Sequence, residues 1–209
     1  GVNSAHRQAA ADRFGVHIAQ STNRFAWFGT TKRFETLTQT FVQSDLGAFN
    51  AHHYRYAPDM STFIVECDAA TFERVGLASK SEDETKTICE RVFAETLDGH
   101  PLIANRSIWR QFPHLWCDRW SDGNRVLMGD ALRTAHFSIG SGTRLAIEDA
   151  IALADALDET HGDIPAGLAF YEAKRRPPVE KLVKAARQSA DWYDDFAAHM
   201  ALGPRDFAM

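Results

Sequence analysis

The sequence predicts an α+β fold, in which an antiparallel or mixed sheet is followed by a strand–loop–helix unit and C-terminal helices. Three observations favour this class. Residues 25–66 hold runs of β-branched and aromatic residues that are separated by turn signals. Residues 126–157 pass from a short apolar strand through a glycine-bearing loop into a helical pattern. Helical periodicity then continues, with one interruption, to residue 200.

The composition indicates a folded protein of one domain, or of one large domain with an appendage. Of the 209 residues, 44% are hydrophobic and 11% aromatic, which is enough for a packed core. The formal charge of −5 argues against non-specific binding of nucleic acid. No apolar run approaches the roughly 20 residues that cross a bilayer, and no signal peptide is visible. We therefore expect a cytoplasmic protein that binds neither nucleic acid nor a membrane.

The cysteines and histidines do not predict a metal site. Cys67, Cys89 and Cys117 lack metal-ligand spacing and cannot all pair, which favours free thiols in a reducing compartment. The nine histidines include no HExxH pattern. The adjacent His52 and His53 would point to opposite faces of a strand.

The first half of the chain is expected to form the sheet. Ser4 is a suitable N-cap for a helix through Arg13. Four strands are expected, at residues 25–34 (broken at Gly29), 36–43, 47–56 and 61–66. The last two would form a hairpin, and all four an antiparallel meander with one buried face.

Helices and short strands connect this sheet to the central stretch. Helices are expected at residues 67–76 and 81–97, the second opened by a capping box of Ser81 and Glu84. Strand signals then stand at residues 102–103 and 116–120, and a turn at 122–124 precedes the central strand.

The central stretch begins with an apolar strand at residues 126–128 and continues into a helix that starts near Gly142. The apolar face predicted for this helix consists of Ala146, Ala150, Leu153 and Leu157. Two further helices are expected at residues 164–176 and 179–200, separated by two consecutive prolines.

Glycines and a carboxylate in the central stretch predict a ligand site. Gly140 and Gly142 allow close backbone approach, and the free N–H groups of the first helical turn attract an electron-rich oxygen. Asp130, at the strand end, is placed to accept hydrogen bonds from hydroxyl groups. A ligand with both hydroxyls and an anionic edge would suit the two ends, whereas the alternative is that the glycines only make a tight turn.

This stretch resembles the second FAD-binding motif of the single-component aromatic hydroxylases, the flavoprotein monooxygenases built like p-hydroxybenzoate hydroxylase. The resemblance implies that Gly129 and Asp130 contact the ribityl chain. It also implies that the helix start faces the flavin pyrimidine edge, through Gly140, Ser141, Gly142 and Thr143. The family usually has histidine, proline and asparagine at the positions of Arg133, Phe137 and Arg144.

Further residues match the family outside this motif. The pattern Gly1-x-x-Ser4-x-x-Arg7 resembles the second half of its Asp-Gly motif, which implies that Arg7 lies near the FAD pyrophosphate; the alternative is a solvated arginine. The sheet would form the roof of the substrate pocket, lined by Phe49, His52, His53 and Tyr54, with Trp116 nearby, although each could instead be a core or solvated residue. The candidate general bases are His136, ranked first because it lies in the motif loop, His52 and His53.

Within this family the runs RFAWFGTTKRF, FNAHHYRY and TAHFSIGSGT look most like the salicylyl-CoA 5-hydroxylases and anthraniloyl-CoA monooxygenases. The resemblance implies FAD as cofactor, NAD(P)H as co-substrate and hydroxylation of the aromatic ring of an aryl-CoA thioester. Basic residues that could serve a CoA site are Arg24, Lys32, Arg33 and Arg55. The alternatives are a hydroxylase of an indole or tryptophan-derived substrate, and a folded substrate-binding module without activity.

The resemblance also implies a division of the chain and a missing part. Residues 1–24 would be a remnant of the FAD domain, residues 25–120 the substrate-binding sheet, and residues 121–209 the second flavin motif with its helices. No GxGxxG pattern, the first FAD-binding unit of the family, is found. We therefore expect a fragment of a longer flavoprotein that by itself binds FAD weakly or not at all.

Overall fold

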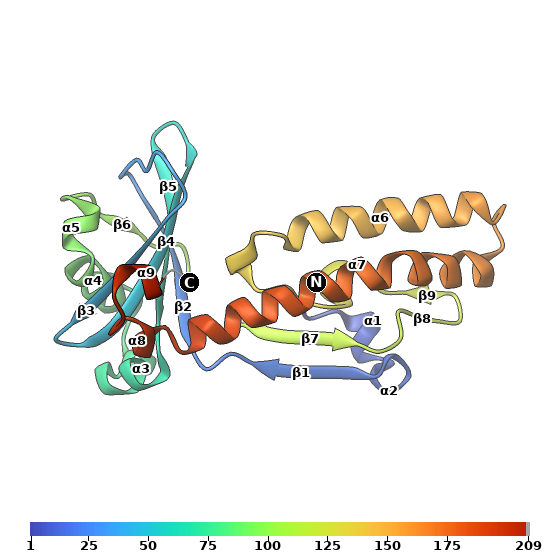
Figure 1. Ribbon diagram of the computed structural model, residues 1–209, viewed down its shortest axis with the longest axis horizontal. Helices are drawn as coiled ribbons and strands as arrows, with labels where there is room; N and C mark the ends of the chain where they lie inside the picture. The colour runs from blue at the N-terminus through green and yellow to red at the C-terminus, as the bar shows by residue number, and fades with distance from the viewer. Residues whose placement is uncertain (208–209) are drawn as a thin grey trace. The chain divides into compact units, whose positions relative to one another are not determined.

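The computed structural model describes residues 1–207, and its contacts divide the chain into two compact units (Figure 1). Residues 1–21 and 113–192 form one unit, which we call the motif unit. Residues 22–112 and 193–209 form the other, which we call the sheet unit. The predicted α+β class is confirmed, because the chain forms antiparallel sheets together with helices. The functional division at residues 24/25 and 120/121 stays a prediction.

A five-stranded antiparallel sheet forms the centre of the sheet unit. In spatial order its strands are β3 (Thr38–Ser44), β4 (Gly47–Ala57), β5 (Met60–Cys67), β2 (Arg24–Thr30) and β6 (Leu102–Ile103). The predicted hairpin is confirmed as β4 and β5, but the simple meander is wrong because β2 pairs with β5 and not with β3. The expected break at Gly29 is also wrong, since the ladder to β5 continues through that residue.

The two faces of this sheet differ in chemistry. Directly opposed residues of neighbouring strands share a face, and successive residues alternate between faces. One face, which we call the helix face, holds Phe28, Phe49 and Phe63 in a core packed by the helices α3 to α5. The other, the polar face, carries Asn50, His52 and Glu66 on β4 and β5. Hydrophobic burial thus uses one side of the sheet and leaves polar groups on the other.

The helices on the helix face follow the sequence closely. They are α3 (Ala69–Val75), the 3-10 turn η1 (Leu77–Ser79), α4 (Glu82–Val92) and α5 (Ala94–Leu97). The capping box of Ser81 and Glu84 is confirmed. The single helix expected over residues 81–97 is interrupted at Phe93, whose buried ring packs edge-on against Phe63 of the sheet. Two short helices, α8 (Phe196–His199) and α9 (Pro204–Phe207), complete the sheet unit, with Phe196 near Phe41 of β3.

The motif unit begins with short elements that the sequence indicated only in part. Ser4 caps a helix, as predicted, but that helix is α1 (Ala5–Gln8), and a second turn, α2 (Ala11–Phe14), follows it. Gly15 then adopts a left-handed conformation and leads into β1 (Val16–Gln20), a strand that was not expected. β1 pairs antiparallel with β7 (Pro113–Cys117), and β8 (Ser121–Asp122) pairs with β9 (Arg125–Val126) across the predicted turn.

The central stretch contains less strand than predicted. Only Val126 of the expected strand at 126–128 belongs to β9, and the chain continues into the 3-10 turn η2 (Gly129–Ala131). A second 3-10 turn, η3 (Phe137–Ile139), precedes α6 (Gly142–Glu159). The start of α6 is as predicted, but its buried face is displaced by one residue. That face consists of Leu145, Asp149, Ala152 and Ala156.

The expected interruption at Pro177-Pro178 is wrong, because α7 (Ile164–Asp194) is one helix with both prolines inside it (Figure 1). Prolines disfavour a helix interior by removing a hydrogen bond and clashing with the preceding turn. Here packing and ion pairs stabilise the helical segments before and after the two prolines. Tyr171 and Val179 are fully buried, and Arg176 pairs with Glu172 and Glu180 one turn to either side. Within residues 1–207 no helix is long and apolar enough to cross a bilayer.

Candidate functional site

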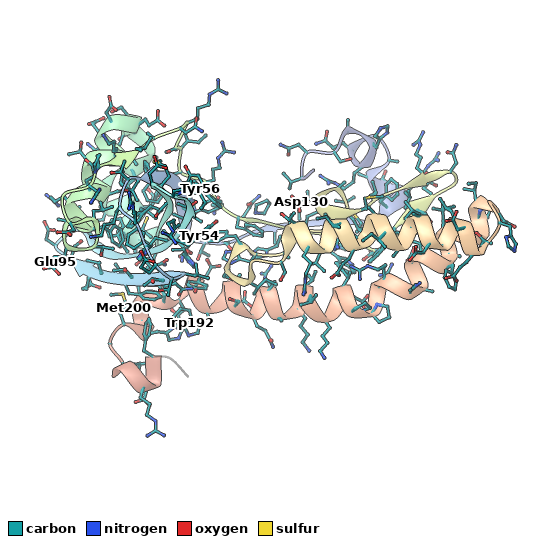
Figure 2. The ribbon with its side chains drawn as sticks, turned by 90° about the horizontal axis from the view of Figure 1, so that it is seen from above. Tyr54, Tyr56, Glu95, Asp130, Trp192 and Met200 are labelled. Carbon is teal, nitrogen blue, oxygen red and sulfur yellow. The ribbon has the colours of Figure 1, made fainter. Side chains whose placement is uncertain are left out.

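The turn at Gly129 and Asp130 packs tightly against α6. Gly129 has φ +54°, and a Cβ atom at this position would lie 3.0 Å from the Cβ of Ala146. Only glycine suits both the left-handed backbone and the close approach of the helix. Asp130 is exposed, and Figure 2 shows its side chain beside α6. The motif thus buries its glycine and leaves its carboxylate available to a ligand.

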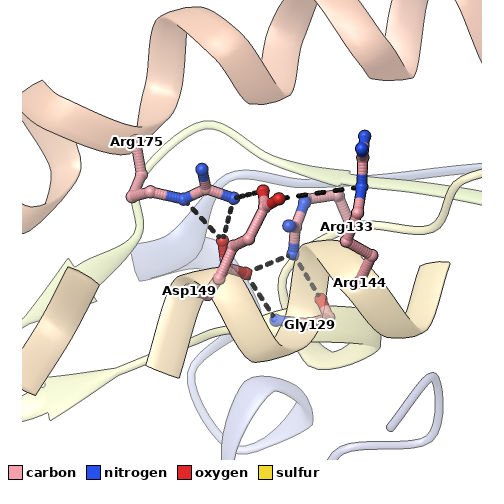
Figure 3. A network of polar contacts seen from close by, with 6 residues as sticks. Gly129, Arg133, Arg144, Asp149 and Arg175 are labelled. Atoms are coloured by element: carbon pink, nitrogen blue, oxygen red, sulfur yellow. Dashed lines mark hydrogen bonds and ion pairs between the residues drawn. The ribbon is translucent and has the colours of Figure 1, made fainter. Parts of the chain in front are cut away.

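A buried ionic network fixes this turn to α6 (Figure 3). Asp149 Oδ2 accepts a hydrogen bond from the Gly129 amide at 3.0 Å and lies 2.7 Å from Arg133 Nη1. Arg133 in turn donates to the Gly129 carbonyl, and Arg175 donates to Asp149 Oδ1 at 3.1 Å. The Arg133 and Asp149 side chains are almost completely buried. Arg133, which stands where the family usually has histidine, is therefore part of the support of the motif.

α6 begins without a side-chain cap. Gly140 adopts a left-handed conformation with φ +60°, and the Ser141 hydroxyl donates to the Ile139 carbonyl instead of accepting from the helix. A Cβ atom at Gly140 or Gly142 would meet nothing within 4 Å. The first turn of this 18-residue helix thus has no side-chain cap and has free space beside its two glycines, and helix geometry and dipole favour an electron-rich oxygen at such an end. These residues fit the carbonyl-and-nitrogen edge of a flavin.

Arg7 is a buried residue and not the solvated arginine of the alternative. The residue is 2% exposed, and Nη1 donates to the carbonyl of Ala131 in η2 at 2.8 Å. A second contact joins the guanidinium to the Val2 carbonyl. The hydrogen bond to Ala131 shows that Arg7 supports the Gly129–Asp130 turn; its place near the FAD pyrophosphate stays a prediction.

Two of the predicted site residues, His136 and Trp116, line one cavity of about 540 Å³ in the motif unit. Its walls also include His17 and His114 from β1 and β7 and Val183 from α7. His136 Nδ1 lies 2.9 Å from the Ser138 hydroxyl, and the Ser138 amide donates to the same nitrogen at 3.3 Å. These contacts fix the orientation of the imidazole, a group suited to proton transfer near neutral pH.

The polar face of the sheet unit holds a buried group of charged and polar side chains. His52 Nε2 lies 3.7 Å from Glu66 Oε2, and both side chains are less than a tenth exposed. Asn23 Nδ2 donates to Glu66 Oε1 at 2.9 Å and to the Tyr193 carbonyl at 2.6 Å. The Tyr193 ring lies 5.1 Å from that of His52. Within residues 1–207, Glu66 Oε2 and the side-chain amide of Asn50 form no hydrogen bond. Such buried polar atoms are costly unless they meet a ligand or water.

His53 and Phe49 lie on the helix face instead. The His53 ring stacks on Phe63 at 5.2 Å and its Nε2 lies 2.9 Å from the Thr40 hydroxyl. Burial, with a smaller effect of His52, lowers the pKa of His53 to about 4. Phe49 is fully buried in the core. Both therefore lie on the opposite side of the sheet from Glu66, whereas Tyr54, which is partly exposed and pairs with Thr62, lies on the polar face (Figure 2).

Sequence reasoning missed Glu66 and Asn23. The signal for Glu66 was present, because a charged residue two positions after Ile64 in an apolar strand must share the face of Ile64. The pairing of Ile64 with His52 then brings the carboxylate to the histidine, but that register becomes known only from the structure. Asn23 immediately precedes β2, and no sequence motif or periodicity marks it as a site residue.

The remaining titratable groups do not form a metal site. Within residues 1–207 no group of three or more His, Cys, Asp or Glu side chains could hold a metal ion. The three cysteines are free and buried. Burial raises the pKa of the Cys67 thiol and that of Cys117, the latter to about 11, so neither is an activated nucleophile.

Comparisons with known proteins identify the family of the chain. A family described as FAD binding domain matches residues 1–186. A salicyloyl-CoA 5-hydroxylase from a Streptomyces species is 41% identical over 208 residues, 96% of this chain and 40% of that protein. A 3-hydroxy-4-methyl-anthranilyl-[aryl-carrier protein] 5-monooxygenase from Streptosporangium sibiricum is 39% identical, over 92% of this chain and 51% of that protein.

One further relative supports the same family, and a solved structure shares the fold. A protodeoxyviolaceinate monooxygenase from Chromobacterium violaceum is 37% identical over 88% of this chain and 50% of its own length. The chain thus spans about half the length of these curated relatives. The crystal structure of PqsL, a probable FAD-dependent monooxygenase from Pseudomonas aeruginosa, shares the fold with a TM-score of 0.69 at 24% identity, covering 93% of this chain and 55% of PqsL. The chain belongs to the FAD binding domain family of flavoprotein aromatic monooxygenases.

Proposed function

We propose that the full-length protein is an FAD-dependent monooxygenase that hydroxylates the ring of an aryl-CoA thioester and uses NAD(P)H as reductant. The observation that carries this proposal is the start of α6, which lacks a side-chain cap and has free space beside Gly140 and Gly142. The salicyloyl-CoA 5-hydroxylase, at 41% identity, supports the thioester substrate. When bound, FAD supplies the redox chemistry that activates oxygen.

The residues of the motif unit hold the cofactor in this proposal. The exposed carboxylate of Asp130 accepts hydrogen bonds from the ribityl hydroxyls. The amides of Gly142 and Thr143 stabilise negative charge at the pyrimidine edge, because they lie at the positive end of the helix dipole. Arg7 and the ion pairs of Asp149 fix the position of the Gly129–Asp130 turn relative to α6.

The sheet unit supplies the groups suited to an aromatic substrate. His52 accepts the proton of a ring hydroxyl or amine, and Glu66, 3.7 Å away, stabilises the imidazolium that results. Tyr54, on the same face, contacts the substrate. His136 is the alternative base, and it lies with Trp116 at the cavity of the motif unit.

Turnover assays with the full-length protein test this function. Oxidation of NADH and NADPH would be followed with salicylyl-CoA, anthraniloyl-CoA and free tryptophan, and products would be identified by mass spectrometry after incorporation of labelled oxygen. We expect a bound flavin spectrum and a hydroxylated thioester. Hydroxylation of tryptophan alone would favour the indole-substrate alternative, and a protein without flavin or turnover would favour a binding module.

A further inference from the structure

A groove on the sheet unit has no role in the function described so far. It has a volume of about 740 Å³ and lies along β2, β6 and the segment that follows β6. Four large apolar side chains on its walls are strongly exposed: Trp27 (47%), Tyr56 (61%), Ile103 (40%) and Ile108 (57%). Large exposed apolar surfaces of this kind mark binding sites more often than isolated exposed residues do.

The groove is also positively charged. Arg106 and Arg110 lie on it, and its lining contains no acidic residue. Within residues 1–207 neither guanidinium forms an ion pair or a side-chain hydrogen bond. By contrast, several other basic residues of the sheet unit have partners. Lys32 pairs with Asp98, and Arg55 Nη2 lies 3.9 Å from Glu35 Oε2. The Arg24 guanidinium lies over the Phe72 ring on the helix face. Of the basic residues considered for a CoA site, three therefore already have partners.

The groove includes a residue of the polar face of the sheet, Trp27. Trp27 of β2 is opposite Ile64 of β5, which is opposite His52 of β4, so all three share the polar face. One strand separates β2 from β4, which places them about 10 Å apart. An aromatic acyl group near His52 and a nucleotide in the groove would thus lie on the same face of the sheet. The pantetheine arm of CoA, when extended, is long enough to connect them.

We propose that the groove binds the phosphorylated adenosine end of the CoA thioester, an inference that rests on the proposed function. Arg106 and Arg110 contact the phosphates, for which guanidinium groups form strong charge-assisted hydrogen bonds. Trp27 and Tyr56 offer flat rings on which the adenine stacks. The specificity for CoA therefore comes from a part of the chain far in sequence from the flavin motif.

A comparison of two thioesters tests the groove. The full-length holoenzyme would be assayed with salicylyl-CoA and with the salicylyl thioester of pantetheine, which lacks the nucleotide. In the double variant Arg106→Gln/Arg110→Gln we expect KM for the CoA thioester to rise about tenfold or more, given the strength of hydrogen bonds to charged groups. The KM for the pantetheine thioester and both kcat values should not change. Trp27→Ala should show the same split.

The control is Arg91→Gln, which removes one charge from α4 on the helix face and should alter neither KM. An unchanged KM for the CoA thioester in the double variant, or an equal rise for both thioesters, would overturn the groove assignment while the proposed function stands. Failure of the wild-type enzyme to hydroxylate either thioester would overturn both proposals.

Discussion

The carboxylate of Asp149 contacts three separate parts of the motif unit. It accepts from the Gly129 amide, and it pairs with Arg133 and Arg175. A buried carboxylate needs such partners, because an isolated charge in the interior costs several kcal/mol. None of these contacts could be predicted from the sequence, where Asp149 is one acidic residue on a helical pattern and Arg133 is only a departure from the family.

Removing this charge should destabilise the protein strongly. We expect Asp149→Asn to lower the free energy of unfolding by about 3–5 kcal/mol, because Arg133 then remains buried without a counter-charge. The measurement is denaturant unfolding of the full-length protein. The matched control is Glu148→Gln, whose side chain is 39% exposed and also pairs with Arg175; we expect it to cost less than about 1 kcal/mol. Equal losses in the two variants would contradict a special role for the buried network.

At the level of single elements, α6 shows what a sequence pattern can and cannot locate. The pattern placed its start at Gly142 correctly, because the glycines and the following periodicity mark it. The predicted face at Ala146 and Ala150 was displaced by one residue, because the pattern counted only apolar residues and the buried face includes Asp149. Similarly, the prolines of α7 predicted a break that packing around Tyr171 and Val179 overrides.

Substitution of Ser141 by aspartate, at the start of α6, should affect FAD affinity and the stability of the apoprotein in opposite directions. In Ser141→Asp the new carboxylate can accept from the first-turn amides itself, so we expect the apoprotein to gain about 0.5–1 kcal/mol of stability. The same carboxylate competes with the flavin edge, so FAD affinity should fall. Thermal unfolding and flavin fluorescence titration measure the two effects. Ser141→Ala, which removes a hydroxyl that does not cap the helix, should leave affinity nearly unchanged. Undiminished FAD binding by Ser141→Asp would show that these amides do not face the flavin.

At the level of the whole molecule, each unit has a hydrophobic core of its own. One core surrounds Phe63 in the sheet unit and the other surrounds Trp120 in the motif unit. Neither unit is continuous in sequence, since residues 1–21 belong with residues 113–192. The sequence predicted the local hairpin of β4 and β5, but not the pairing of β1 with β7, because no local pattern encodes a partner about a hundred residues away.

Acid should destabilise the folded chain through His53. Its pKa falls from the ordinary value of 6.5 to about 4 on folding, so between these pH values the unfolded chain binds the extra proton. Stability is therefore lost as the pH falls from 6.5 to 4, by at most about 3 kcal/mol. His53→Leu should flatten this part of the pH dependence in denaturant titrations. Parallel curves for the variant and the wild type would assign the acid loss to other groups.

The hydrogen bond from Gly129 to Asp149 has a consequence for how a ligand is received. It joins the first residue of η2 to the first half of α6, so the spacing between the Asp130 carboxylate and the helix start is set before anything binds. A ligand that contacts both the Asp130 carboxylate and the start of α6 must match this fixed spacing. Because the site is preorganised, such a ligand binds with a smaller loss of conformational entropy.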